Sequence, residues 1–168
     1  MTALYTRSIA TPLGSITASA SDTALVGIWF DGQKYFPADK PAWLSAPDHP
    51  LLNAAQDWLD AYFKGENKPI DFPLDPQGGS TFRRRVWDIL RAIPHGTTTT
   101  YGAIAAQIAR ETGVKKVSAQ AVGGAVGHNP ISILIPCHRV VGSTGSLTGY
   151  AGGLDKKAAL LKLEGILL

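Results

Sequence analysis

A stretch rich in proline and glycine near the middle of the chain limits its architecture more than any other feature. Residues 67 to 79, NKPIDFPLDPQGG, hold three prolines and two adjacent glycines. Helices and central strands do not tolerate this composition, so the stretch predicts a linker between two domains. We place the boundary at the glycine pair and expect domains at residues 1 to 78 and 79 to 168.

The two halves differ in charge. Residues 1 to 78 hold 5 Lys or Arg against 9 Asp or Glu, a balance of −4, whereas residues 79 to 168 hold 11 against 4, a balance of +7. The net charge of +3 hides this difference. A basic second half indicates contact with a polyanion, most often nucleic acid, and a chance asymmetry of solvated surfaces is the alternative.

The first domain has the pattern of an antiparallel sheet followed by a helix. Residues 4 to 10, 15 to 20 and 24 to 30 predict three short strands separated by turn residues, in a meander. Apolar residues at helical spacing then predict a helix over residues 52 to 63, with Gly65 placed to end it.

Helical spacing dominates the second domain. Ser80 is placed to cap a first helix that ends before Pro94. The apolar residues of this helix lie on one face, at Phe82, Val86, Ile89 and Ile93. Its outward positions are Arg84, Arg85, Asp88 and Arg91. A second helix follows Thr100 as its cap and ends near Gly113.

A third helical segment, residues 117 to 129, has mostly small side chains and an adjacent glycine pair, Gly123 and Gly124. Each glycine in a helix interior costs about 1 kcal/mol relative to alanine. The pair therefore predicts a close backbone approach, either by another helix or by a sugar-phosphate chain. Together with the preceding helix this segment forms a candidate helix-turn-helix, with Lys115 and Lys116 in the turn.

Cys137 is the one cysteine of the chain, which excludes an internal disulfide and a multi-cysteine zinc site. The apolar run at 131 to 135 predicts a buried strand that Pro136 ends. Burial makes a thiol inert, so reactivity needs a base and positive potential. His138 follows directly, and its contact with Cys137 needs a turn or a bridging water. An inert core cysteine beside a surface histidine is the alternative.

Four stretches of the second domain carry a resemblance to a known family: FRRRVWDILRAIPHGTTTTYGAIA, AVGGAVGHNP, NPISILIPCHRVVG and GSLTGYAGGLDKKAALLKLEG. In this order they resemble the O⁶-alkylguanine-DNA alkyltransferases, also called methylated-DNA–protein-cysteine methyltransferases. The resemblance implies an α+β fold. A small N-terminal domain of antiparallel sheet and helix, similar to ribonuclease H, precedes a mostly helical, winged-helix-like C-terminal domain that holds the helix-turn-helix.

The same resemblance implies a DNA repair protein and single-turnover transferase. Such a protein moves a methyl or other small alkyl group from O⁶ of guanine in duplex DNA to its own cysteine, here Cys137. Displacement at an ether carbon needs a soft, strong nucleophile, and a thiolate fits best. Because the thioether product is not reversed, one molecule acts once. The range of alkyl groups and activity on O⁴-alkylthymine stay open.

Catalytic roles follow from the resemblance position by position. Cys137 takes the place of the alkyl acceptor, His138 that of the base acting through a water, and Glu164 that of the acid orienting the imidazole. Tyr101 stands where the family has the phenol that donates a proton to the departing guanine. Asn129 stands where it braces the turn that presents the cysteine, or is an ordinary turn asparagine.

The resemblance also implies a glycine-rich loop that closes over the extruded base. Tyr150 forms part of the pocket wall, and Lys157 supports the loop. Their alternatives are a packing aromatic and a solvated helix lysine. The backbone groups of Cys137, Val140 and Ala151 recognise the guanine edge. Many relatives have a hydroxyl-bearing residue at the position of Ala151, so here the backbone N–H is the donor that remains.

Contact with double-stranded DNA is implied in the minor groove, with the damaged nucleotide flipped out of the duplex. The residues expected at this interface are Gln120, Ala121, Gly123, Gly124, Lys115 and Lys116. Gln120 stands where the family has an arginine that fills the vacated stack. Glutamine is shorter and uncharged, so extrusion is weaker or uses another residue.

No cofactor is implied. Residues 1 to 78 contain one histidine, His49, and no cysteine, so the zinc found in some relatives is not expected. No apolar run reaches the roughly 18 residues of a membrane span, and the N-terminus lacks a signal-peptide pattern, so we expect a cytoplasmic protein. One helix-turn-helix that reads damage without sequence preference needs no symmetric partner, so we expect a monomer.

Two other functions use the same residues. A lesion-binding protein without transfer is known among relatives that lack the acceptor cysteine, and the presence of Cys137 counts against it here. A Cys-His hydrolase or acyltransferase would need an oxyanion hole and repeated turnover, and a basic helix-turn-helix half would be unnecessary for it.

Overall fold

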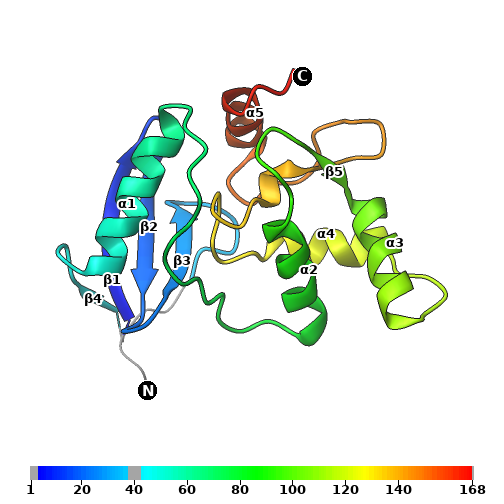
Figure 1. Cartoon of the computed structure of the whole chain (residues 1–168), viewed down its shortest axis with the longest axis horizontal. Coiled ribbons are helices and arrows are strands. Elements are labelled where there is room, and N and C mark those ends of the chain that lie inside the picture. The colour runs from blue at the N-terminus through cyan, green and yellow to red at the C-terminus, as the bar shows by residue number, and fades with distance from the viewer. Residues whose placement is uncertain (1–3, 38–42, 168) are drawn as a thin grey trace. The chain divides into compact units, whose positions relative to one another are not determined.

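The computed structural model describes residues 4–37 and 43–167. The chain divides into two compact units (Figure 1). The first unit runs to Gln77 and also takes in Pro130–Ser132, and the second comprises Gly78–Asn129 and continues from Ile133. A sheet dominates the first unit and helices dominate the second, which confirms the predicted α+β class.

The sheet of the first unit contains the predicted antiparallel meander. It consists of β1 (Leu4–Thr11), β2 (Gly14–Ala20) and β3 (Leu25–Phe30). A fourth strand, β4 (Trp43–Ser45), pairs in parallel with β1 and gives the order β3-β2-β1-β4. This strand was not predicted, because three residues are too short to show an alternating pattern.

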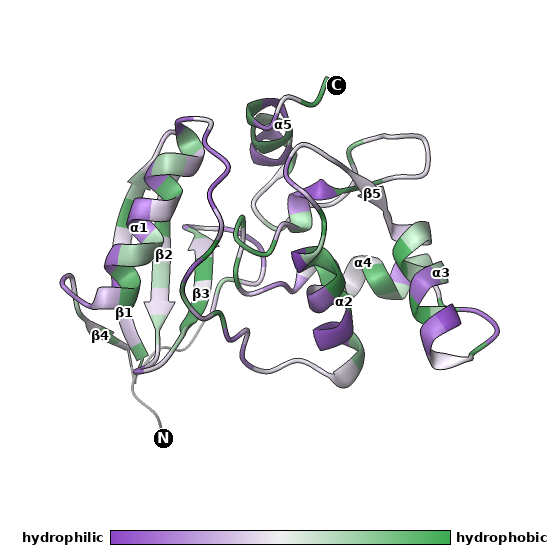
Figure 2. Cartoon of the chain, viewed as in Figure 1, coloured by the Kyte–Doolittle hydropathy of each residue, from purple (hydrophilic) through white to green (hydrophobic). Residues whose placement is uncertain are grey.

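Helix α1 (Pro50–Phe63) packs on this sheet. It starts two residues earlier than predicted, because the His49 ring nitrogen Nδ1 accepts the N–H of Leu51 at 3.2 Å and caps the helix. Its buried side chains include Leu52 and Leu59. Opposite them β3 is buried along its whole length, and Figure 2 shows much of it in the green of hydrophobic residues.

The proline-rich stretch at 67 to 79 is less free than a linker. The backbone N–H of Leu25 donates to the carbonyl of Pro73 at 2.9 Å, and the N–H of Asp75 donates to the carbonyl of Leu25 at 2.8 Å. Leu74 therefore forms a parallel bridge beside β3. Proline lacks only its own N–H, so the neighbouring residues can still pair with an edge strand.

The second unit has four helices among its described residues: α2 (Thr81–Arg91), α3 (Tyr101–Thr112), α4 (Ala119–Gly127) and α5 (Leu154–Leu163). Strands β5 (Thr99–Thr100) and β6 (Val140–Val141) form a small parallel pair. The predicted caps are confirmed, since the hydroxyls of Ser80 and Thr100 each accept a backbone N–H. Gly113 ends α3 with a left-handed φ of 74°.

Helix α2 buries a broader face than its spacing predicted. Trp87 and Leu90 are buried beside Val86 and Ile89, because α2 contacts α4 as well as the short turn at Cys137–Arg139. The Trp87 indole N–H donates to the carbonyl of Ala125 at 2.8 Å and ties α2 to α4. The outer residues of the predicted face, Phe82 and Ile93, are half-buried.

The expected buried strand at 131 to 135 is wrong, although the segment is buried. Ile131 forms a single bridge with Ile28, and the N–H of Ser132 donates to the carbonyl of Ile28 at 3.1 Å. Ile133 then adopts a φ of +70°, which turns the chain out of an extended path. This conformation is unusual for a β-branched residue. In the described part of the chain, no helix is long and apolar enough to cross a membrane.

Candidate active site around Cys137

A short 3-10 turn, η1 (Cys137–Arg139), presents the cysteine. Pro136 begins it with φ −81° and ψ 66°, and the N–H of Arg139 donates to the Pro136 carbonyl at 3.0 Å. Cys137 is 5% exposed and His138 is completely buried. The histidine is therefore a core residue, which rules out the alternative of a surface histidine beside the cysteine.

His138 and Glu164 form a buried pair. Nε2 of His138 lies 2.6 Å from Oε2 of Glu164, which follows the last residue of α5, and both side chains are fully shielded from solvent. Burial lowers the pKa of His138, and the neighbouring Glu164 carboxylate opposes this shift. A carboxylate accepts the Nε2–H, so it favours the neutral tautomer in which Nδ1 carries the lone pair.

Arg139 completes this pair and was missed as a site residue. Its Nε donates to Oε1 of Glu164 at 2.8 Å, and its Nη2 donates to Oε2 at 3.1 Å. The backbone N–H of Gly96 donates to Oε1 at 3.1 Å. A sequence signal existed, because an arginine four residues after a predicted buried strand needs a carboxylate partner, and residues 79 to 168 hold only four Asp or Glu residues.

Asn129 closes the segment that leads to the cysteine. Its side chain is buried, and Nδ2 donates to the carbonyl of Ile135 at 2.8 Å, across six residues of chain. The backbone N–H of Asn129 donates to the Val126 carbonyl at the end of α4. Asn129 therefore connects the end of α4 to the backbone two residues before Cys137.

The surroundings of the Cys137 thiol act on its pKa in opposite directions. Burial raises its pKa most strongly, as expected for an enclosed thiol. A hydrogen bond from Asn129, the ammonium charge of Lys157 and a hydrogen bond from Tyr150 each lower it. The resting group is a thiol, and the positive charge and donors around it reduce the cost of forming a thiolate.

Lys157 and Tyr101 connect helices α5 and α3 to the glycine-rich loop. The Lys157 ammonium is completely buried and donates to the carbonyls of Thr148 at 2.8 Å and Gly149 at 3.1 Å. The Tyr101 hydroxyl donates to the Thr148 carbonyl at 2.9 Å. Burial lowers the pKa of Lys157 to about 8 and raises that of Tyr101. Lys157 is thus not a solvated helix lysine.

The other expected substrate residues lie around the same loop. Val140 is buried in β6, and Tyr150 and Ala151 are half-buried. Tyr150 is close enough to Cys137 for a hydrogen bond that affects the thiol. The loop folds on itself where the N–H of Gly142 donates to the carbonyl of Ser146 at 2.9 Å.

The expected DNA residues lie on the exposed side of α4 and before it. Gln120, Ala121 and Gly124 are exposed, as are Lys115 and Lys116 in the preceding loop. A Cβ at Gly124 would meet nothing within 4 Å, whereas one at Gly123 would lie 3.8 Å from the Tyr101 ring. A packed helix is therefore not the reason for Gly124, which corrects one of the two expected explanations for the glycine pair.

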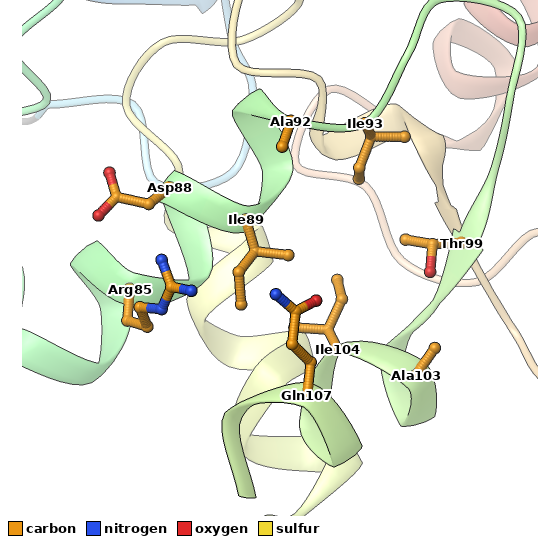
Figure 3. A pocket seen from close by; sticks show the side chains of 9 residues that line it. All are labelled: Arg85, Asp88, Ile89, Ala92, Ile93, Thr99, Ala103, Ile104 and Gln107. Carbon is orange, nitrogen blue, oxygen red and sulfur yellow. The ribbon is translucent and has the colours of Figure 1, made fainter. Parts of the chain in front are cut away.

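An open pocket of about 230 Å³ lies between α2 and α3, and Figure 3 shows it. Its apolar lining includes Ile89, Ile93 and Ile104, and the charged residues Arg85 and Asp88 also line it. Arg85, expected to point outward, forms an ion pair with Glu111 of α3, with its Nε 2.8 Å from Oε2. None of the predicted site residues lines this pocket.

Two family models match the chain. The model described as "6-O-methylguanine DNA methyltransferase, ribonuclease-like domain" matches residues 4–76. The model described as "6-O-methylguanine DNA methyltransferase, DNA binding domain" matches residues 81–166. Between them the two models cover nearly the whole chain.

Similar proteins carry the corresponding name. A methylated-DNA–protein-cysteine methyltransferase of Mycolicibacterium paratuberculosis is 44% identical over 94% of this chain and 90% of its own length. One from Haemophilus influenzae is 38% identical over 99% of this chain and 89% of its own length. The crystal structure of Mycobacterium tuberculosis OGT in complex with DNA matches with a TM-score of 0.82 and 41% identity, over 95% of this chain and 92% of that one.

Proposed function

The chain belongs to the 6-O-methylguanine DNA methyltransferase family, and on this premise we propose that it repairs duplex DNA by transferring the O⁶-alkyl group of guanine to its own Cys137. The buried Glu164–His138 pair directly beside the cysteine supports this assignment most strongly. The carboxylate of Glu164 favours Nδ1 as the basic nitrogen of His138, and this nitrogen is the one we assign to take the thiol proton through a water.

The proposed reaction begins with ionisation of the Cys137 thiol. His138 takes the thiol proton of Cys137 through a water, at Nδ1. The thiolate sulfur forms a bond to the alkyl carbon while the bond from that carbon to guanine O⁶ breaks and its electron pair passes to the base. Tyr101 donates a proton to the departing guanine. The thioether left on Cys137 ends the reactivity of the molecule.

The loop contacts support a role for Lys157 and Tyr101 in this step. The ammonium of Lys157 holds two carbonyls of the loop and lies 3.4 Å from the Tyr101 hydroxyl oxygen. Both residues therefore fix the loop that carries Tyr150 and Ala151. We assign Tyr150 to the pocket wall, and the backbone of Cys137, Val140 and Ala151 to the guanine edge.

The exposed face of α4 fits DNA contact. Ala121 and Gly124 allow close approach of a sugar-phosphate chain, and Lys115 and Lys116 supply charge for phosphate. We assign this face to the minor groove, with Gln120 nearest the extruded nucleotide, and assign the active form to a cytoplasmic monomer.

Stoichiometry tests the proposal. Protein is mixed with an excess of duplex that carries O⁶-methylguanine, and the restored guanine is counted. We expect a plateau at one guanine per protein molecule, with Cys137→Ala binding the duplex and restoring none. Continued turnover would instead indicate a hydrolase, and binding without restoration by the unaltered protein would indicate a lesion-binding function.

A further inference from the structure

Arg139 is a buried cation that makes three hydrogen bonds through its guanidinium and has no role yet in the proposed reaction. It is 8% exposed and is the last residue of the turn η1 that presents Cys137. Besides its two contacts with Glu164, its Nη1 donates to the carbonyl of Ile93 at 2.6 Å, next to the turn that holds Gly96. The guanidinium is therefore held between the Glu164 carboxylate and the Ile93 carbonyl.

These contacts favour the ionised form of the buried Glu164 carboxylate. A fully buried carboxylate resists ionisation unless opposite charge and donors compensate the lost hydration. The fork of Arg139 supplies the charge and two hydrogen bonds, and Gly96 supplies a third. An ionised, fixed carboxylate is the stronger acceptor for the His138 Nε2–H and holds the ring with Nδ1 as its basic nitrogen.

Arg139 also acts on His138 through its charge. The groups whose charge reaches this ring are Glu164 at the end of α5, Lys157 within α5 and Arg139 on the same turn. Glu164 raises the pKa of His138, whereas Arg139 and Lys157 lower it. Arg139 thereby offsets the carboxylate that it holds, so that the imidazole is oriented without being driven to its protonated form.

We propose that Arg139 is a positioning residue that fixes Glu164 and, through it, keeps His138 a neutral, correctly oriented base for transfer to Cys137. This inference rests on the proposed function. It predicts that loss of the guanidinium changes the pH dependence of transfer and not only the stability of the fold.

The test measures transfer rate from an O⁶-methylguanine duplex between about pH 5.5 and 9 for the unaltered protein, Arg139→Gln, Arg139→Lys and the control Arg85→Gln. Arg85 also forms a carboxylate ion pair, with Glu111, but its side chain is 42% exposed. Nitrogen-15 NMR of His138 follows the titration of the same ring without any transfer.

In Arg139→Gln we expect the acidic limb of the pH–rate profile to move about one pH unit upward, so that the rate falls several-fold more at pH 6 than at pH 8. The NMR titration of His138 moves upward with it. Arg139→Lys keeps the positive charge but loses the paired hydrogen bonds of the guanidinium to Glu164. We therefore expect the acidic limb of its pH–rate profile to stay in place while its transfer rate falls about threefold at every pH. Arg85→Gln leaves both unchanged.

An acidic limb and a His138 titration that both stay in place in Arg139→Gln would overturn the inference, whatever happens to the melting temperature. If that variant does not fold, Arg139→Lys decides: a wild-type rate at every pH shows that the fork is unnecessary. Failure of the unaltered protein to transfer the methyl group refutes the proposed function instead, and the NMR titration still decides the role of Arg139.

Discussion

Nζ of Lys157 lies 3.4 Å from the hydroxyl oxygen of Tyr101, so a buried ammonium on α5 contacts the first residue of α3. The same ammonium donates to two carbonyls of the loop that follows β6. One charge thus joins two helices and a loop that are distant in the chain, and its ionisation affects the stability of all three.

Lys157→Met should remove a pH-dependent part of the stability. The pKa of Lys157 is about 8 in the folded protein, against 10.5 for the free side chain, so between these values the unfolded state binds more protons. Stability from this group therefore rises with pH across that window. We expect the difference in unfolding free energy between wild type and variant to grow by roughly 1 kcal/mol per pH unit there.

Lys162→Met on the same helix is the control, because Lys162 is exposed. Chemical denaturation at several pH values above and below 8 measures both variants. A difference between wild type and Lys157→Met that is constant with pH would contradict the assignment of a buried, depressed ammonium.

His138 should make the protein lose stability in acid. Burial lowers its pKa in the folded state, so below about pH 6.5 the unfolded state takes up a proton that the folded state refuses. We expect up to about 1.4 kcal/mol of stability to be lost per pH unit in this range, and His138→Asn to lack this loss. Urea denaturation between pH 7 and 5 measures it, and parallel curves for both proteins would argue against the prediction.

Asn129→Ala should weaken the turn that presents the cysteine. Without Nδ2 the buried carbonyl of Ile135 keeps only the N–H of Cys137 as a donor, and the lost hydrogen bond costs about 0.5–1.5 kcal/mol. The thiol also loses a donor that favours its ionised form. The melting temperature and the rate of alkyl transfer should both fall. Asn53→Ala is the control, since Asn53 bonds to Arg7 at an exposed site of the first unit. Equal effects of the two variants would refute the role of Asn129.

Gly124→Ala should separate stability from DNA binding. A Cβ there meets nothing within 4 Å, so the substitution adds helix propensity and raises stability by about 0.5–1 kcal/mol. If α4 approaches the DNA backbone closely, the added methyl group lowers duplex affinity while transfer from a free alkylguanine base is unaffected. Binding isotherms at fixed salt test this, and an unchanged affinity would move the DNA contact away from Gly124.

Local sequence signals predicted most elements, because caps, spacing and turn residues act over short distances. Thr100 and Gly113 mark the ends of α3 within a residue. The segment before Cys137 could not be predicted in this way, since a continuous apolar run reports burial and not backbone shape. Its turn depends on the left-handed Ile133 and on Asn129, whose partner lies six residues away.

The pairing of Glu164 with His138 was predicted from the sequence, and the contacts of Arg139 with Glu164 and Ile93 were not. Cys137, His138 and Glu164 came from a resemblance, and the structure brings the last two within hydrogen-bond distance. The partners of Arg139 were not predicted, because its carboxylate lies 25 residues away in the chain and the carbonyl of Ile93 lies 46 residues away. Such long-range pairs arise only when α5 packs against the turn at η1.

The mass of the protein after reaction tests the central claim most directly. Protein is incubated with a duplex that carries O⁶-methylguanine, and intact mass and peptide masses are then measured. We predict one added methyl group per molecule, located on the peptide that contains Cys137, with no further addition at longer times. Unchanged protein mass, or a methyl group on any other residue, would contradict alkyl transfer to Cys137.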